Sequence, residues 1–294
     1  FGEDLLVSRA VHVVLLAMLG ATIAGCAAML APRTRVLPVA VTLVFLIAAG
    51  ILPLNPGYAS LPAVLLLLGG CLIYSHSVPT KSLTSLLAAS SLVGVAGVFR
   101  WDFCIFGLLA MCLTMGTVMV ARRTTEGLDI RTMAAAFLPA PTVMLIAFTP
   151  SLISGGAARW FEEVPLFLLR EFQTWRNLEF VRPAIWQVAS AWLAKDLMSL
   201  SSAIARLVYA AVAPCAALAA FMIAVRRIRG SRGPVASADA LALVLSLLTL
   251  LLLNQMRVRS GFPQGFPALA AALPLVAYVL SAIPVKTSPQ RRAL

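Results

Sequence analysis

The chain has 294 residues, of which 61% are hydrophobic and only 12% are charged, and its mean hydropathy is +0.96. A soluble domain of this length carries about twice that charged fraction, so the composition excludes an ordinary water-soluble fold. The net charge of +12 does not indicate a nucleic-acid binder, because the basic residues lie mostly in short loops between apolar runs. We therefore expect residues 1–294 to form a single integral membrane domain, an all-α, polytopic helix bundle.

Apolar runs of near-membrane length follow one another along the chain. A helix needs about 20 apolar residues to cross the hydrocarbon core of a bilayer, and about nine runs meet or approach this length. Breakers such as Pro32, Pro79 and the Asn55-Pro56-Gly57 turn separate them. The predicted spans are 5–30, 36–54, 61–75, 83–99, 103–120, 132–148, 203–225, 238–253 and 267–283.

The charge of the loops predicts the orientation of the bundle. Short loops rich in Lys and Arg stay in the cytoplasm, and one alternate set of loops concentrates its basic residues in this way. That set contains Arg33, Arg35, Lys81, Arg122, Arg123, Arg131, Arg226, Arg227, Arg229, Arg232, Lys286, Arg291 and Arg292. We therefore expect a cytoplasmic C-terminus and an outer N-terminus.

One long segment, residues 150–202, lies outside the membrane in this topology. All five tryptophans of the chain fall on the outer side, and all but Trp101 lie in this segment: Trp160, Trp175, Trp186 and Trp192. Aromatic and aliphatic residues recur there at helical spacing, opposite polar residues. This pattern predicts amphipathic helices in the outer membrane interface.

Polar residues that could carry chemistry collect at two outer helix ends. Arg100 and Asp102 flank Trp101 at one of them, and Arg257 and Arg259 lie at the other. The planar guanidinium fork suits phosphate, whereas the structural alternative is that these arginines reach lipid headgroups. The tryptophans likewise form either an interfacial belt or a platform for sugar stacking.

Metal and cofactor motifs are not found in the sequence. It contains no Walker loop, no HExxH and no CxxC pair, and its two histidines are far apart. We therefore predict no metal site and no cofactor, although a divalent ion at the phosphate stays open. The five cysteines lie in or beside apolar runs and are predicted to be small buried residues.

Four short motifs occur in an order that resembles a known family. They are Phe1-Gly2-Glu3-Asp4 leading to Arg9, the turn at 55–57, the stretch 94–103, and the stretch 257–267. Together they resemble bacterial GT-C-type glycosyltransferases related to protein mannosyltransferases and lipid A aminoarabinose transferases. The catalytic acid of that family lies in its first outer loop, so the resemblance implies a catalytic carboxylate upstream of Phe1.

The resemblance implies transfer of a sugar from a polyprenyl-phosphate donor at the non-cytoplasmic face of a bacterial cytoplasmic membrane. The acceptor would be a glycan, lipid or protein of the cell envelope. Arg100, Arg257 and Arg259 would contact the donor phosphate. The acceptor and sugar side would comprise Asp102, Trp101, Trp160, Trp175, Trp186 and Trp192. Two alternatives remain open, an O-antigen polymerase or ligase and a non-catalytic transporter or flippase subunit.

Overall fold

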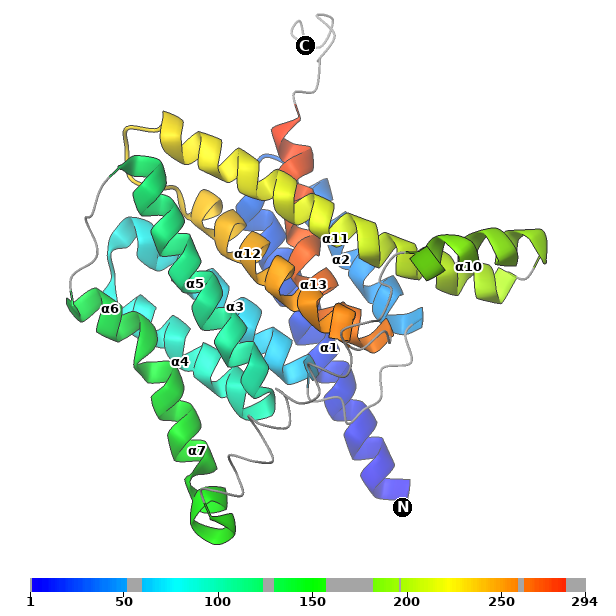
Figure 1. The fold of residues 1–294 in the computed structure, drawn as a ribbon, viewed down its shortest axis with the longest axis horizontal. Helices are drawn as coiled ribbons and strands as arrows, with labels where there is room; N and C mark the ends of the chain where they lie inside the picture. Colours follow the sequence, from blue (N-terminus) through cyan, green and yellow to red (C-terminus); the bar gives the residue numbers. More distant parts are fainter. Residues whose placement is uncertain are drawn as a thin grey trace, which may run out of the picture.

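A computed structural model of the chain describes residues 2–51, 60–123, 130–156, 182–195, 197–258 and 262–283. Every regular element within these ranges is an α-helix, as predicted (Figure 1). In chain order the helices are α1 (Gly2–Leu30), α2 (Val36–Ile51), α3 (Ser60–Thr80), α4 (Leu83–Phe99), α5 (Trp101–Arg122), α6 (Ile130–Phe137), α7 (Pro139–Gly155), α10 (Arg182–Leu193), α11 (Leu197–Gly230), α12 (Ser237–Val258) and α13 (Phe262–Ala282).

Among the described residues, five helical stretches are long and apolar enough to cross a membrane, which indicates a membrane protein. Four further helices are apolar but shorter, at 10–17 residues. The five long stretches are Val7–Leu30, Ser60–Thr80, Trp101–Arg122, Arg131–Gly155 and Ala211–Gly230, and the shorter ones are Val36–Ile47, Leu83–Phe99, Ser237–Leu253 and Phe266–Ala282. Each of the nine predicted spans therefore coincides with apolar helix, while a full crossing by all nine stays a prediction.

Proline divides one predicted span into two helices. Residues 132–148 are covered by α6 and α7, which meet at Leu138. Pro139 and Pro141 have no N–H to donate to the preceding turn, so the helical ladder is interrupted there. The backbone N–H of Leu138 still donates to Ala134 (2.9 Å), and that of Thr142 donates to Leu138 (3.2 Å). The apolar stretch therefore continues through the junction as a bent unit.

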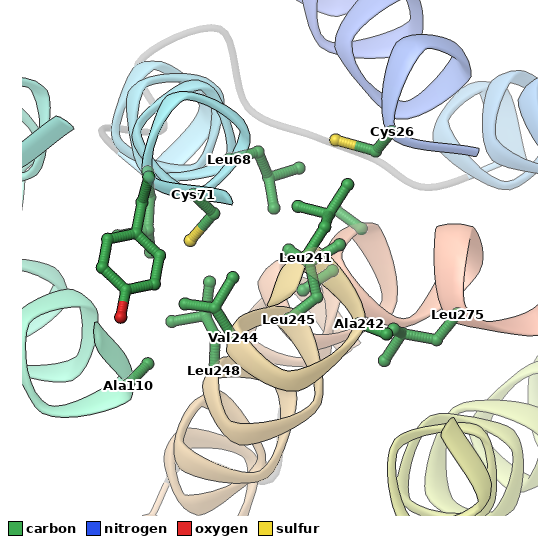
Figure 2. Close-up of a cluster of buried hydrophobic side chains, with 14 of the residues drawn as sticks. Cys26, Leu68, Cys71, Ala110, Leu241, Ala242, Val244, Leu245, Leu248 and Leu275 are labelled. Carbon is green, nitrogen blue, oxygen red and sulfur yellow. The ribbon is translucent and has the colours of Figure 1, made fainter. Parts of the chain in front are cut away.

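The middle of the bundle is formed by α12 and α13. Residues 240–246 of α12 and 266–275 of α13 are buried without interruption, which requires neighbours on every side of a helix. Leucines of α12 point toward α3 in Figure 2, and Ala242 and Leu275 meet on the side of α13. The interior is thus filled by packed apolar side chains: Cys26, Leu68, Cys71, Ala110, Leu241, Val244, Leu245 and Leu248.

The outer helices of the bundle leave much apolar surface exposed. In the 18-residue apolar window of the stretch 131–155 only 11% of the residues are buried, against 56% in that of α3, and α7 packs mainly along α4. Exposed side chains such as Ile146 and Ile153 therefore face the bilayer in a membrane protein. The cysteines divide in the same way: Cys26, Cys71 and Cys104 are buried as predicted, but Cys112 and Cys215 are exposed.

The predicted outer segment 150–202 is mostly helical where the structure describes it, and only Gly156 and the turn at Ala194 and Lys195 are not helix. Its first residues belong to α7, which continues to Gly155, and its last residues begin α11 at Leu197. Between these lies α10, which covers part of the predicted amphipathic stretch, packs against α11 and extends away from the bundle (Figure 1). Residues 157–181, with the other predicted amphipathic stretch, lie outside the described residues.

The connections between helices gather at two ends of the bundle. The start of α1, the α4–α5 hairpin and the end of α7 lie at one end (Figure 1). The end of α5, the α11–α12 connection and the end of α13 lie at the other. These are the two sets of loops that the charge analysis separates, and which end faces the cytoplasm stays a prediction.

Candidate functional site: an anchored arginine at the α4–α5 hairpin

The hairpin between α4 and α5 consists of a single residue. Arg100 has an extended backbone (φ −150°, ψ 99°) between Phe99, the last residue of α4, and Trp101, the first of α5. Its N–H donates to the carbonyl of Ala96, and its own carbonyl accepts from the N–H of Phe103, both at 2.9 Å. Both backbone polar groups of Arg100 are therefore satisfied within the turn.

The guanidinium of Arg100 has three partners. Its Nε and Nη2 donate to the two carboxylate oxygens of Asp102 at 3.2 and 2.7 Å, and Nη1 donates to Ser60 Oγ at 2.7 Å. The group also lies 4.8 Å from the centre of the Phe103 ring, a cation–π contact. Because Ser60 begins α3, the guanidinium joins three helices at this end of the bundle.

The remaining donors of Arg100 decide what this site can bind. A guanidinium has five N–H groups, and the hydrogen bonds to Asp102 and Ser60 use three of them, which leaves two without an acceptor among the described residues. The side chains of Arg100 and Asp102 are 26% and 17% exposed, so the pair is reachable and not sealed in the core. An anion that accepts both remaining N–H groups would meet a donor whose orientation is already determined.

Glycines place the hairpin by close packing. A Cβ on Gly97 would lie 2.6 Å from Cys104 Cβ and 2.7 Å from Met144 Sδ, and one on Gly94 would lie 2.7 Å from the backbone oxygen of Ala140. Such distances leave no room for a side chain, so α4 approaches α5 and α7 only because these residues are glycine. The glycines of the 94–103 motif thus have a packing role.

The other predicted site residues are not all brought to this hairpin. Trp101 and Asp102 lie at it, both half-buried. Trp192 is 71% exposed on α10, away from the hairpin. Trp186 also belongs to α10, and Arg257 lies one residue before the end of α12, but their side chains are not among those described. Arg259, Trp160 and Trp175 lie outside the described residues.

The backbone nevertheless brings the end of α12 toward the hairpin end of the bundle. Arg122, the last residue of α5, donates from Nη2 to the carbonyl of Gly233 in the connection before α12 (2.6 Å). The two helices pack together and have 22 residues each. They are therefore antiparallel, and the Val258 end of α12 points the same way as the Trp101 end of α5.

Sequence reasoning missed a second arginine–aspartate cluster at the opposite end. Arg227 of α11 lies 3.6 Å from Asp239 of α12, and Tyr278 of α13 donates its hydroxyl to Asp239 at 2.6 Å. The guanidinium lies 5.0 Å from the centre of the Tyr278 ring. An acid in the first turn of one helix, just after a basic helix end, was the available signal. The part played by Tyr278 depends on tertiary packing.

The described residues contain no group of three or more His, Cys, Asp or Glu that could hold a metal ion. The candidate site is therefore the anchored guanidinium with its acid and its half-buried tryptophan. Comparison of the chain with protein-family models, with curated proteins and with solved structures gives no match.

Proposed function

We propose that this chain belongs to a membrane glycosyltransferase that moves a sugar from a polyprenyl-phosphate donor to an acceptor at the non-cytoplasmic face. The observation that carries the proposal is the guanidinium of Arg100. It lies at the end of three apolar helices and is oriented by Asp102 and Ser60, and two of its N–H groups have no acceptor in the part of the chain that the structure describes. The order of the motifs along the chain supports the same activity.

A lipid phosphate fits this position for physical reasons. Donor groups aimed at the phosphate of a departing lipid carrier stabilise the charge that develops on it. The polyprenyl chain needs an apolar surface directly beside the phosphate, and the exposed side chains of Val98 and Phe99 lie next to Arg100. Asp102 offsets part of the positive charge of Arg100, so the proposal includes a second cation, for which Arg257 and Arg259 are the candidates.

Binding of the carrier lipid is the direct test for residues 1–294. Binding is measured instead of turnover because it reports directly on the proposed phosphate contact and does not depend on the catalytic residue, which the sequence does not identify. The probe is undecaprenyl phosphate added to the purified chain in an uncharged detergent. Native mass spectrometry or a fluorescence titration gives the dissociation constant.

The informative variant is the double replacement Arg100→Gln with Asp102→Asn. It keeps the net charge of the protein and avoids leaving the Asp102 carboxylate without its cation, so the fold is preserved. Loss of a charge-assisted contact costs roughly 1.5–3 kcal/mol, which weakens binding about tenfold to a hundredfold. Lys195→Gln, an exposed cation after α10, is the control and should bind as the parent does. Equal affinity of parent and double variant would remove Arg100 from phosphate binding.

A further inference from the structure

Basic residues from distant parts of the chain meet at the end of the bundle opposite Arg100. The hydrogen bond from Arg122 Nη2 to the carbonyl of Gly233 joins residues 111 positions apart. It brings the end of α5, where Arg123 follows, against the α11–α12 connection, where Arg232 precedes Gly233. Arg123, Arg229 and Arg232 are all exposed. We call Arg122, Arg123, Arg229 and Arg232 the basic end.

Arg227 does not belong to this set, although it lies beside it in sequence. The guanidinium of Arg227 is paired with Asp239, whose Oδ1 lies 3.6 Å from Nη1, and it lies over the ring of Tyr278. Asp239 is the acidic residue of the α11–α12 region, and its carboxylate is paired with Arg227. Among the described residues of this region, the remaining arginines therefore present an excess of positive charge toward solvent.

The backbone at Arg123 is a second observation. Arg123 adopts the left-handed conformation (φ 54°), and its N–H caps the carbonyls of Met119 and Val120. Glycine is the residue that adopts this C-cap conformation with the lowest conformational cost. A cation at this position is favoured by the helix dipole, and it also adds charge beside Arg232.

Exposed apolar side chains follow the basic end along α5 and α11, toward the middle of these helices. Val120 is 74% exposed on α5, and Met222 and Leu218 are 52% and 55% exposed on α11. α5 and α11 pack against each other, so positive charge and exposed apolar side chains succeed one another along the same two helices. A ligand that covers both must carry a negative headgroup and an acyl chain.

We propose that the basic end binds the headgroup of an anionic phospholipid of the surrounding bilayer, with its acyl chains along α5 and α11. Arg123, Arg229 and Arg232 contact the phosphate, and Arg122 is a positioning residue that ties the connection to α5. The apolar surface favours a lipid over a free anion, and the excess positive charge favours an anionic lipid over a zwitterionic one.

The test uses the purified chain in an uncharged detergent with cardiolipin, phosphatidylglycerol and phosphatidylcholine as separate probes. Native mass spectrometry counts retained lipid, and the unfolding midpoint reports stabilisation. We expect retention of the two anionic lipids over phosphatidylcholine, and about fivefold weaker binding for each arginine removed. Inorganic phosphate in large excess should not displace the lipid. Displacement by phosphate, or equal retention of phosphatidylcholine, would overturn the proposal.

Arg123→Gly separates binding from folding. It removes a charge but supplies the residue that the left-handed cap favours, so the unfolding midpoint without lipid should be unchanged or higher while anionic lipid binds about fivefold more weakly. Lys195→Gly is a matched control, because Lys195 is also a basic residue in the left-handed region (φ 53°). It precedes α11, whose 34 residues put it about 50 Å from the basic end. Equal loss of binding in both variants would show a bulk charge effect and contradict a local site.

Discussion

The two ends of the molecule each contain an arginine paired with an aspartate and placed against an aromatic ring, yet the two clusters are built differently. Arg100 and Asp102 are two residues apart and lie at one hairpin, with Phe103 from the same turn. Arg227, Asp239 and Tyr278 come from three separate helices. The first arrangement orients the Arg100 guanidinium through a neighbouring residue and leaves two of its N–H groups without an acceptor among the described residues. The second uses its polar groups to hold α11, α12 and α13 together.

This difference implies different energetic roles for the same residue types. A local pair that is partly exposed stabilises a protein by about 0–1 kcal/mol, since its partners meet in any case and water screens them. A pair that joins helices, with a buried tyrosine hydroxyl as a third member, leaves that hydroxyl without an acceptor if the acid is lost. Mutations at corresponding positions should therefore divide into effects on binding at one end and effects on stability at the other.

The largest expected effect comes from Asp239→Ala. It removes the partner of Arg227 and leaves the buried hydroxyl of Tyr278 without its acceptor, so we expect a loss of about 2–3 kcal/mol, measured from the unfolding midpoint in detergent. Asp102→Ala, the corresponding change at the hairpin, should cost about 1 kcal/mol or less. Asp239→Asn, which keeps an acceptor for Tyr278, should fall between them. Equal losses for Asp239→Ala and Asp102→Ala would contradict the distinction between the two clusters.

Gly97→Ala tests whether close packing positions the Arg100 hairpin. The added methyl group would lie 2.6 Å from Cys104 Cβ, and we expect a loss of about 2 kcal/mol from overpacking together with weaker binding of undecaprenyl phosphate. Gly116→Ala on α5 is the control, because nothing lies within 4 Å of its Cβ position. That change should be neutral or stabilise by up to about 1 kcal/mol through helix propensity. A stable Gly97→Ala protein would show that the hairpin tolerates a wider spacing.

Ser60→Ala should have a small effect on stability and a clearer effect on the orientation of the Arg100 guanidinium. It removes one neutral acceptor of the Arg100 guanidinium, 2.7 Å from Nη1, at a cost of about 1 kcal/mol. The two bonds to Asp102 remain, so the ion pair persists while the guanidinium loses its link to α3. We expect Ser60→Ala to weaken the binding of undecaprenyl phosphate more than it lowers the free energy of unfolding. Tyr278→Phe at the opposite end should lower stability and leave the affinity for undecaprenyl phosphate unchanged.

Much of the fold was predictable because apolar runs and breakers are local features of the sequence. The predicted run 83–99 coincides with α4, and each of the other runs overlaps a helix. The predicted run 203–225 lies within α11, which begins earlier, at Leu197, because an apolar run predicts the part of a helix in lipid and the helix itself can continue beyond it. The run 132–148 was predicted as one span, whereas Pro139 and Pro141 interrupt the helix at Leu138.

The candidate site was predictable only as far as its local members. Arg100 and Asp102 are adjacent enough to suggest a pair from sequence. Ser60 is 40 positions from Arg100, and its contact depends on how α3 packs beside α4, which periodicity does not determine. The same limit applies to the hydrogen bond between Arg122 and Gly233. Trp192 was grouped with the hairpin residues because both were predicted on the same side of the membrane, and that prediction contains no information about helix packing.

The packing of α13 has a consequence for the order in which the protein is assembled during synthesis. α13 packs against α1 and α2 as well as against α11 and α12, and the ring of Phe266 lies 5.6 Å from that of Phe45 on α2. Among the described helices, α13 leaves the ribosome more than 200 residues after α1 and α2. Until then those early helices have no partner on that face. Nascent chains stalled before α13 should therefore retain contacts with the insertion machinery through α1 and α2, and release of these helices into lipid should coincide with the arrival of α13.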